Sequence, residues 1–483
     1  MVEGVFHHPV KPIKFGTDGW RAIIARDFTF ENVRACALGV ARYLERRGMA
    51  SRGLVVGYDT RFASEEFAAE VASVVAASGT RVLLCSRAAP TPVVSFNVVH
   101  RRAAGAVVIT ASHNPWAWNG FKYKSPEGGS AAPEVVAELE GEIARVLAGA
   151  TPQLVPLPEA RSRGLLDDLD PAPPYLAHAA TLVDLGQLRA AGLKVGVDAM
   201  HGAGAGYFPA LLGGGATTFQ EIRGERNPLF PGMAQPEPIA ANLGPLADAV
   251  RRDGLDVGVA LDGDADRLGL VDERGQFITT LQTFALLCLY WLEVRGQRGP
   301  LVKSLTQTGM IERLGQLYDV PVHMTPVGFK YLGPVMVREN ALAAGEESGG
   351  YAFRGNIPER DGIFGGLLFL DMMVRTGKRP SELLEWLYSK VGPHHFDRWD
   401  LEFPPQQREA IQRRTSKARP DRLAGKRVES IDTQDGYRFN LEGGYWALVR
   451  FSGTEPLLRL YAEAESPEQV RELLGALREM AGV

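Results

Sequence analysis

Three aspartates at alternate positions carry the most specific chemistry in this sequence. Asp262, Asp264 and Asp266 directly follow the apolar run 257–261, so a buried strand is expected to end at their carboxylates. Carboxylates this close together repel one another unless a cation binds between them, and ligand sets made only of oxygen favour a hard ion such as Mg²⁺. The pattern therefore predicts a magnesium site, with a solvated acidic turn as the alternative.

A calcium-binding loop is another interpretation of the same segment, because Glu273 is at the twelfth position counted from Asp262. However, Arg267 occupies the sixth position, where the sharp turn of such a loop requires glycine. A strand rather than a helix is also expected to precede the segment. The sequence therefore disfavours calcium.

The segment 110–115, Thr-Ala-Ser-His-Asn-Pro, follows the apolar run 106–109 and places Ser112 and His113 where a strand ends. Adjacent side chains of an extended backbone point to opposite sides, which argues against a hydrolytic Ser-His pair. A serine that receives and passes on a phosphoryl group fits better, because the charge of phosphoserine complements a metal held by three aspartates. Lys122 is close enough in sequence to hold the same group. The alternative for Ser112 is a turn hydroxyl that caps a helix.

Segment 450–456, with Arg459 after it, offers ligands for a second phosphate. It combines two hydroxyls, a glycine that lets backbone N–H groups approach, and a guanidinium at each end, Arg450 and Arg459. A hairpin turn with surface arginines is the alternative.

Two glycine-containing turns complete the set of candidate site segments. In segment 345–350 the glycines let a turn present Glu346 and Ser348 to sugar hydroxyls, although glycine-rich acidic loops are often turns without a ligand. Segment 15–21 is a turn that ends at Arg21 and carries little information alone.

The elements that position these clusters alternate between short apolar runs and amphipathic helical patterns. This alternation predicts α/β layers with largely parallel sheets, in which ligands bind at the carboxyl ends of the strands. The Pro- and Leu-rich segment 151–174 is predicted to be a linker, and Ser466, Pro467 and Gln469 predict the capped start of a terminal helix. The expected domains are 1–160, 161–272, 273–385 and 386–483.

Composition excludes several classes of protein. The 483 residues are 45% hydrophobic, enough for several cores, and the net charge of -4 provides no basic field for nucleic acid. The most membrane-like segment, 284–292, has about nine residues where a span needs about 20, and the N-terminus lacks the features of a secretion signal. The three cysteines predict buried thiols in a reducing compartment. We therefore expect a cytoplasmic protein without membrane or nucleic-acid partners.

Taken together and in this order, the clusters resemble the α-D-phosphohexomutase superfamily, which includes phosphoglucomutases and phosphomannomutases. In that resemblance 110–115 is the phosphoserine loop, 262–267 the metal loop, 345–350 the sugar loop and 450–456 the phosphate loop. The resemblance implies an α/β fold of three related domains with mixed, largely parallel sheets. A C-terminal α+β domain of TATA-binding-protein-like topology would complete a central cleft.

The resemblance also implies a mechanism in which phosphorylated Ser112 donates to a hexose phosphate. The hexose 1,6-bisphosphate that forms would turn around and return its other phosphate, so glucose 1,6-bisphosphate would be both intermediate and activator. The implied roles are Mg²⁺ binding by Ser112, Asp262, Asp264 and Asp266; phosphoryl contacts by Arg21, Lys122, His113 and Arg267; and substrate binding by Lys330, Glu346, Ser348, Arg450, Ser452, Gly453, Thr454 and Arg459.

Departures from the family pattern bear on the sugar. Enzymes with dual specificity often carry histidine where this chain has Gly350, and another histidine in the region of Gly328-Phe329-Lys330. Together with Glu-Glu-Ser, the chain resembles phosphoglucomutases more, with phosphomannomutase or a dual enzyme as the close alternative. Thr110 disfavours phosphoglucosamine mutase, and Lys122 and His113 both stay candidates for the general base.

Two other classes of function are compatible with parts of the sequence. One is a metal-dependent sugar phosphatase, which would hydrolyse the phosphoenzyme, and the other is a non-catalytic sugar-phosphate binding protein. The second would have no use for Ser112 beside three aspartates. The hexose phosphate is the only partner predicted, and both monomer and homodimer stay open.

Overall fold

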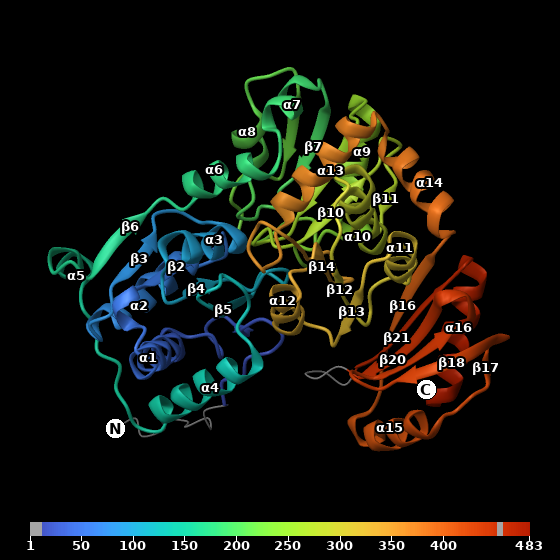
Figure 1. The fold of residues 1–483 in the computed structure, drawn as a ribbon. Helices are drawn as coiled ribbons and strands as arrows, with labels where there is room; N and C mark the ends of the chain where they lie inside the picture. The colour runs from blue at the N-terminus through green and yellow to red at the C-terminus, as the bar shows by residue number, and fades with distance from the viewer. Residues whose placement is uncertain (1–11, 452–456) are drawn as a thin grey trace.

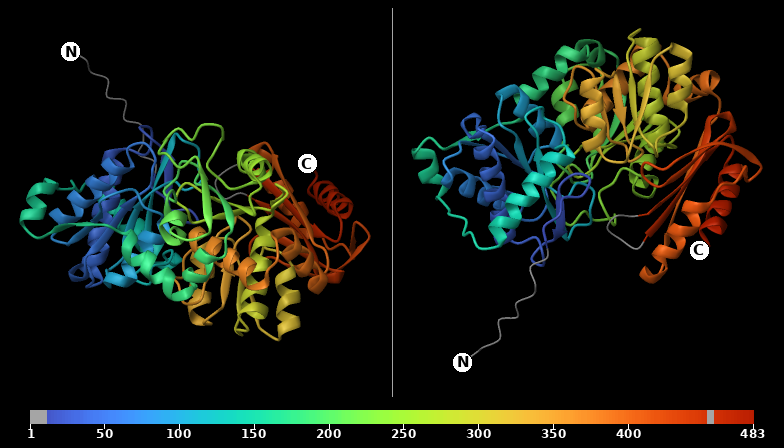
Figure 2. Two further views of the ribbon diagram at one scale, coloured as in Figure 1. Left: turned by 90° about the horizontal axis from the view of Figure 1, so that it is seen from above. Right: turned by 60° about the horizontal axis from the view of Figure 1, so that its bottom comes forward.

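The computed structural model describes residues 12–451 and 457–483, which form four successive β-sheets with their helices (Figure 1). In Figure 1 the first sheet lies at the blue side and the last at the red side, with the second and third between them. The views in Figure 2 also keep the first and last sheets at opposite ends. The predicted phosphate ligands Ser452, Gly453 and Thr454 lie outside the described residues.

The first sheet and its helices are formed by residues 20–169. Their bounds are β1 (Trp20–Ile23), α1 (Phe30–Arg46), β2 (Leu54–Tyr58), α2 (Ser64–Ala77), β3 (Val82–Cys85), α3 (Thr91–Arg101), β4 (Ala106–Ile109), β5 (Trp118–Lys124), α4 (Pro133–Leu147), α5 (Leu157–Ser162) and β6 (Leu166–Leu169). The strand order is β1-β5-β4-β2-β3-β6. Strands β4, β2, β3 and β6 are parallel to one another, whereas β5 is antiparallel to β4 and β1 is antiparallel to β5. β2 and β4 are buried along their whole length, as continuous apolar runs covered on both faces should be.

Segment 151–174 is not the linker that its sequence predicts. It contains α5 and β6, and β6 pairs with β3, so the first sheet extends past residue 160. Ala160, Leu166 and Leu169 are buried in the core of this sheet. The prolines suggested a linker, but the apolar residues between them have enough surface to anchor a helix and a strand.

The second sheet follows the same plan with fewer strands. Its elements are α6 (Ala172–Leu182), α7 (Leu185–Ala190), β7 (Lys194–Asp198), α8 (Tyr207–Leu212), β8 (Thr218–Ile222), α9 (Gly244–Asp253), β9 (Val257–Leu261), β10 (Leu268–Val271) and β11 (Phe277–Ile278). The order is β11-β10-β9-β7-β8, with β8, β7 and β9 parallel and β10 and β11 antiparallel.

The third sheet repeats the plan once more. Its elements are α10 (Thr280–Leu289), β12 (Leu301–Ser304), α11 (Met310–Tyr318), β13 (Val322–Thr325), α12 (Phe329–Arg338), β14 (Ala343–Gly345), β15 (Tyr351–Phe353), α13 (Gly362–Thr376) and α14 (Pro380–Val391). The order is β13-β12-β14-β15, with only β15 antiparallel. Helix α13 contacts β9, β10 and β15, and one hydrophobic core joins the second and third sheets.

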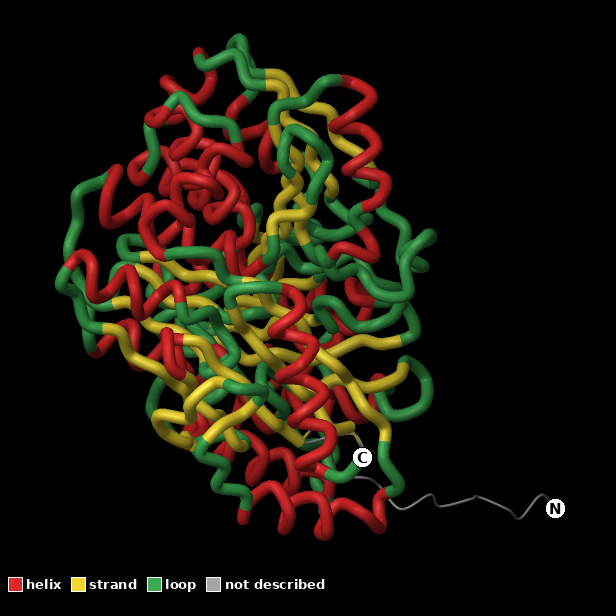
Figure 3. Tube along the Cα trace, turned by 90° about the vertical axis from the view of Figure 1, so that its right-hand side faces the viewer, coloured by secondary structure: helices red, strands yellow, loops and turns green. Residues whose placement is uncertain are grey.

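The fourth sheet is antiparallel throughout. Its elements are β16 (His395–Glu402), α15 (Arg408–Lys417), β17 (Arg422–Leu423), β18 (Lys426–Asp432), β19 (Tyr437–Leu441), β20 (Tyr445–Phe451), β21 (Leu457–Ala464) and α16 (Pro467–Ala481), in the strand order β16-β21-β20-β19-β18-β17. Helix α16 packs on β16, β20 and β21 (Figure 3). The predicted cap is confirmed, because the Ser466 side chain accepts from the Gln469 N–H at 3.2 Å, although the Gln469 amide donates to Ala424 O instead of closing a capping box.

Equivalent loops of the first three sheets carry three of the four sequence clusters. In each of the first three sheets the cluster connects a parallel strand to the antiparallel strand that follows it: β4 to β5, β9 to β10, and β14 to β15. In the fourth sheet it connects β20 to β21. The repeated topology of the first three sheets thus presents three clusters from the same position of each sheet.

The described residues include no helix long and apolar enough to cross a membrane. Cys36, Cys85 and Cys288 are free and buried, which confirms the prediction of buried thiols.

Candidate active site

The β4–β5 loop and the β9–β10 loop meet, although they lie 150 residues apart in sequence. Ser112 is fully buried, and its hydroxyl donates to Asp262 Oδ2 at 2.7 Å. One carboxylate oxygen from each of Asp262, Asp264 and Asp266 lies within 4.8 Å of the others, and all three residues are buried. The structure thus brings the predicted nucleophile directly to the predicted metal ligands.

The acidic triad has free ligand atoms. Within the described residues, Asp264 Oδ1 and Asp266 Oδ1 are buried and have no hydrogen-bond partner. Burial, together with the charges of Asp266 and Asp264, raises the pKa of Asp262 well above its usual range. Buried oxygen atoms without partners are costly unless a cation binds them, so the donor set fits a hard divalent ion.

Lys122 lies on β5 opposite Val108, and its register points its side chain at the triad. The ammonium lies 2.8 Å from Asp264 Oδ2, 3.2 Å from Asp266 Oδ2 and 2.8 Å from Asp18 Oδ2. Burial favours the neutral amine, but these three carboxylates outweigh it and raise the pKa of Lys122. The side chain is therefore a fixed cation in this arrangement.

Arg360, from the segment between β15 and α13, is a site residue that sequence reasoning missed. Its Nη2 lies 2.9 Å from Asp266 Oδ2 and also contacts Asp18. A Cβ at Gly350 would lie 2.3 Å from Arg360 Cδ, so the glycine leaves the space through which the arginine passes. A charged Glu-Arg-Asp run after an apolar strand was the available signal, and nothing in its spacing distinguished it from a surface turn.

Asp18 was missed as well, since only Arg21 was selected from its turn. Its carboxylate joins Lys122 and Arg360 to a second buried ammonium, Lys124, at 2.9 Å. Lys124 also pairs with Glu359 at 2.7 Å. Burial opposes the charge of Asp18, but the three cations lower its pKa well below the usual range. The first and third sheets are thus joined by a chain of buried ion pairs.

The side chain of His113 lies beside that of Ser112, contrary to the prediction from an extended backbone. Ser112 has a left-handed backbone, with φ 50°, rather than an extended one, and His113 Nδ1 lies 3.3 Å from the Ser112 hydroxyl. On its other side, His113 Nε2 lies 3.4 Å from Arg267 Nη2. Burial first, and then the charges of Arg267 and Arg21, lower the pKa of His113 well below its usual range. The imidazole is therefore neutral at physiological pH.

The two other predicted arginines flank this group. Arg267 pairs with Glu237 at 2.5 Å, and Arg21 donates to Asn114 Oδ1 at 2.7 Å. Both guanidiniums lie close enough to His113 to depress its pKa.

The sugar loop 345–350 contacts Arg360, which passes beside Gly350. Glu346 Oε1 accepts from the Gly328 N–H at 2.8 Å, and burial raises the pKa of Glu346 to about 7. Ser348 is partly exposed, and Lys330 donates to Gly16 O at 3.2 Å. Lys330 thus reaches the N-terminal segment, whereas Glu346 is held within the third domain.

The fourth sheet presents two arginines from its central hairpin. Arg450 on β20 lies directly opposite Arg459 on β21, at the base of the loop 452–456. Arg450 Nε lies 3.0 Å from Asp435 Oδ1, and Arg459 Nε lies 3.9 Å from Asp400 Oδ2. Burial opposes the charge of Arg450, but Asp435 and, further away, Glu347 of the sugar loop raise its pKa. The sugar loop and the arginine hairpin are therefore electrostatic neighbours.

Comparison with protein-family models covers most of the chain. The four successive domains of the phosphoglucomutase/phosphomannomutase family, named domain I, II and III (alpha/beta/alpha) and the C-terminal domain, match residues 12–148, 173–275, 281–391 and 404–480. The chain belongs to this family. The resemblance to α-D-phosphohexomutases is therefore confirmed, and the chain is an enzyme of the phosphoglucomutase/phosphomannomutase type.

Several individual proteins resemble this phosphohexomutase over its whole length. A phosphoglucomutase/phosphomannomutase of Thermococcus kodakarensis is 31% identical, covering 95% of this chain and 96% of its own. A phosphoglucosamine mutase of Cereibacter sphaeroides is 32% identical, covering 97% and 99%. A crystal structure from Thermus thermophilus, assigned as a phosphomannomutase, has 34% identity and a TM-score of 0.85, covering 98% and 100%.

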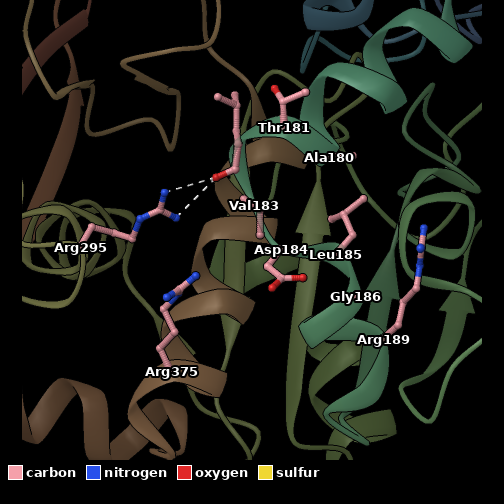
Figure 4. Close-up of a pocket in the computed structure, with 10 residues that line it drawn as sticks. Ala180, Thr181, Val183, Asp184, Leu185, Gly186, Arg189, Arg295 and Arg375 are labelled. Atoms are coloured by element: carbon pink, nitrogen blue, oxygen red, sulfur yellow. Dashed lines mark hydrogen bonds between the residues drawn. The ribbon is translucent and has the colours of Figure 1, made fainter.

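A groove whose lining includes none of the candidate site residues has a volume of about 530 Å³ and lies between α7, α13 and the segment after α10 (Figure 4). Its three arginines already have protein partners. Arg189 donates to Leu211 O, Arg295 to Leu182 O, and Arg375 pairs with Asp371 at 2.7 Å. The groove therefore has a structural explanation in the packing of the second sheet's helices against the third.

Proposed function

We propose that this phosphohexomutase interconverts hexose 1-phosphate and hexose 6-phosphate through a phosphoserine at Ser112 and a hexose 1,6-bisphosphate. The observation that carries the proposal is the 2.7 Å hydrogen bond from Ser112 to Asp262, beside a buried ammonium on Asp264 and Asp266. A phosphoryl group on Ser112 would enter a site built of one triad of carboxylates and several fixed cations. Such a site supports phosphoryl transfer, in which positioning and charge stabilisation do most of the catalytic work.

Mg²⁺ is the cofactor that the donor set supports, held by Asp262, Asp264, Asp266 and an oxygen of phosphorylated Ser112. When bound, Mg²⁺ would neutralise charge on the phosphoryl oxygens and fix their direction. Lys122, whose ammonium lies 2.8 Å from Asp264 Oδ2, would supply positive charge to the transferring phosphoryl group from beside the triad. Arg267 and Arg21, which lie against His113 and Asn114, would supply further positive charge from the opposite side.

His113 and Lys122 both stay candidates for proton handling at Ser112. Arg267 Nη2, which can only donate, lies 3.4 Å from His113 Nε2, so the neutral imidazole carries its proton on Nδ1, 3.3 Å from the Ser112 hydroxyl. The three carboxylate neighbours of Lys122 keep it protonated. Either side chain would have to release a proton before it could act as the general base for Ser112.

The substrate's other phosphate would bind at Arg450, Arg459 and the loop residues Ser452, Gly453 and Thr454. Glu346 and Ser348, with Lys330, would hold sugar hydroxyls between the two phosphate sites. One site is for chemistry and the other for holding, so a hexose 1,6-bisphosphate can bind in either direction. The phosphate that the bisphosphate returns to Ser112 is therefore the other one, and the hexose phosphate that is left is the isomer of the substrate.

Glucose phosphates are the preferred substrates in this proposal. Gly350 replaces a histidine of the dual-specificity pattern, and Arg360 fills the space that any side chain at this position would need. Glucosamine phosphate is a second candidate, because relatives such as the Cereibacter sphaeroides protein are phosphoglucosamine mutases. Initial rates on glucose, mannose and glucosamine 1-phosphates, with Mg²⁺ and a trace of the matching bisphosphate, separate these possibilities.

The mechanism is tested by the mass of the Ser112 peptide after incubation with glucose 1,6-bisphosphate. We expect one added phosphoryl group on Ser112 and a loss of turnover of at least about 10⁴-fold in Ser112→Ala, since the nucleophile is removed. A Ser112→Ala protein with normal turnover would overturn the proposal. Release of inorganic phosphate without isomerisation would favour the phosphatase instead.

A further inference from the structure

Arg61 lies just beyond the end of β2, next to the phosphoserine loop, and is fully buried. Its guanidinium donates to four backbone carbonyls of one short segment, and its Nε lies 3.2 Å from Asp59 Oδ2. The carbonyls, with their distances, are those of Ser112 at 2.5 Å, Asn114 at 2.6 Å, Pro115 at 3.0 Å and Trp118 at 3.1 Å. All the N–H groups of the two terminal nitrogens therefore donate to this segment.

The same segment is held from its other side. Asp59 Oδ2 accepts from the Thr110 hydroxyl at 2.6 Å, and Thr110 Oγ1 accepts from the Ser112 N–H at 2.8 Å. Asp59 and Arg61 thus fix the backbone of Ser112 at both its N–H and its carbonyl. This double hold stabilises the left-handed φ of 50°, which a serine rarely adopts without support.

A loop of the second sheet covers the guanidinium. The ring of Phe230 lies over Arg61, with 4.9 Å between Cζ and the ring centroid, and Phe230 is only 1% exposed. Arg226, from the same loop, donates to Thr60 O at 3.1 Å. Buried stacking on an aromatic face strengthens a cation's position and excludes water from its hydrogen bonds.

We propose that Arg61 is a positioning residue for phosphoryl transfer, which holds the phosphoserine loop so that Ser112 points at the acidic triad. This inference rests on the proposed function. The terminal nitrogens of Arg61 have no donor left for a phosphate, so the residue acts through the loop backbone rather than on the reacting atoms. Reactions of this kind depend on alignment within fractions of an ångström, and a looser loop would let water compete with the sugar hydroxyl for the phosphoryl group.

The test uses Arg61→Lys in the full chain. A lysine keeps the charge but offers three donors without a planar fork, so it cannot hold four carbonyls together. We expect kcat to fall about 10- to 100-fold while KM for the hexose phosphate changes less than about 3-fold. Arg52→Lys is the matched control, because Arg52 donates to the carbonyls of Arg102 and Ala103 in the same domain.

A second readout separates positioning from simple loss of stability. The phosphorylated protein can lose its phosphate to water, when the bond from phosphorus to Ser112 Oγ breaks and a water oxygen replaces it, giving serine and inorganic phosphate. We expect the number of isomerisations per phosphate released to fall at least about tenfold in Arg61→Lys and to stay unchanged in Arg52→Lys. A merely destabilised protein would lose active molecules without changing this ratio.

An Arg61→Lys protein with wild-type kcat and an unchanged ratio would overturn the inference. If Arg61→Lys does not fold, Phe230→Leu, which removes the stacked face and keeps the guanidinium, must lower the same ratio, and an unchanged ratio there overturns the inference equally. Failure of the wild-type protein to phosphorylate Ser112 would instead overturn the proposed function. In that case, amide hydrogen exchange of residues 110–118 decides whether Arg61 holds the loop, with faster exchange expected in Arg61→Lys alone.

Discussion

The charge of single residues controls the acidic triad. Two cations, Lys122 and Arg360, lie within hydrogen-bond distance of the carboxylates that are expected to bind Mg²⁺. They offset part of the repulsion among three buried carboxylates, which would otherwise resist folding. The oxygen atoms without a partner, Asp264 Oδ1 and Asp266 Oδ1, belong to the same carboxylates. The two cations therefore compete electrostatically with a divalent ion for these carboxylates.

The competition predicts a gain in metal affinity for Lys122→Met. Removing a positive charge 2.8 Å from Asp264 Oδ2 leaves the triad more negative, and we expect unphosphorylated protein to bind Mg²⁺ about tenfold more tightly. Titration calorimetry measures this directly. Lys124→Met is the control, since Lys124 pairs with Asp18 and Glu359, and its effect should be several-fold smaller. Weaker binding by Lys122→Met would show that the lysine preorganises the triad instead.

Some of these residues were accessible to sequence reasoning and others were not. The three aspartates at alternate positions and Ser112 after an apolar run can be recognised from the sequence, because such patterns serve few other chemical functions. Asp18 and Arg360 cannot be recognised in this way, because their importance comes from their contact across domains rather than from local spacing. The position of His113 was predicted wrongly, since the left-handed backbone of Ser112 depends on contacts with Arg61 and Asp59 that lie more than 50 residues away.

Secondary-structure elements explain why the clusters converge. In the first three sheets a parallel strand runs into an antiparallel neighbour, and the connecting loop carries the functional residues. The alternation of apolar runs and helical patterns predicted the α/β layers, and the fold class is confirmed. Segment 151–174 was misjudged because its prolines are helix starters as well as breakers: Pro156 and Pro171 directly precede α5 and α6.

Gly350, in the loop after β14, is expected to be sensitive to substitution. Gly350→Ala would place a Cβ 2.3 Å from Arg360 Cδ and move the guanidinium away from Asp266 and Asp18. We expect kcat to fall about tenfold and the protein to be destabilised by about 1–3 kcal/mol, as for overpacking of a filled site. Steady-state kinetics and thermal unfolding measure both effects. Gly141→Ala in α4, which meets no atom within 4 Å, should keep full activity.

A double-mutant cycle sharpens this prediction. If Gly350→Ala acts by displacing Arg360, its effect on kcat should largely disappear in an Arg360→Ala background. Additive effects would show that the new methyl group disturbs the sugar loop by another route.

At the scale of the whole molecule, buried ion pairs, a shared hydrophobic core and a buried hydrogen-bonded contact connect the domains. Asp18, Lys124, Glu359 and Arg360 join the first and third sheets, and a common core joins the second and third. The fourth sheet follows Gly392-Pro393 and meets the third through a buried contact. Glu463 Oε1, on β21, accepts from the Gly309 N–H at 2.7 Å and lies 2.8 Å from His394 Nδ1.

This contact predicts that Glu463 sets the position of the arginine hairpin. Glu463→Ala leaves the Gly309 N–H and His394 without their acceptor, which costs about 1–3 kcal/mol and weakens the link between the third and fourth sheets. Arg450 and Arg459 lie on the same two strands, so the holding site for phosphate should become less well placed relative to Ser112. We expect KM for the hexose phosphate to rise about 3- to 10-fold, with a smaller change in kcat.

Glu465→Ala provides the matched control on the same polypeptide segment. Glu465 pairs with Lys426 at 2.6 Å inside the fourth domain, and in the described residues it forms no hydrogen bond or ion pair with Gly309 or His394. Its KM should stay within about twofold of wild type, because the contact of Glu463 with Gly309 and His394 is intact. Small-angle scattering should detect a larger radius of gyration for Glu463→Ala alone. An unchanged KM together with an unchanged radius would show that core packing, and not this carboxylate, fixes the fourth domain against the third.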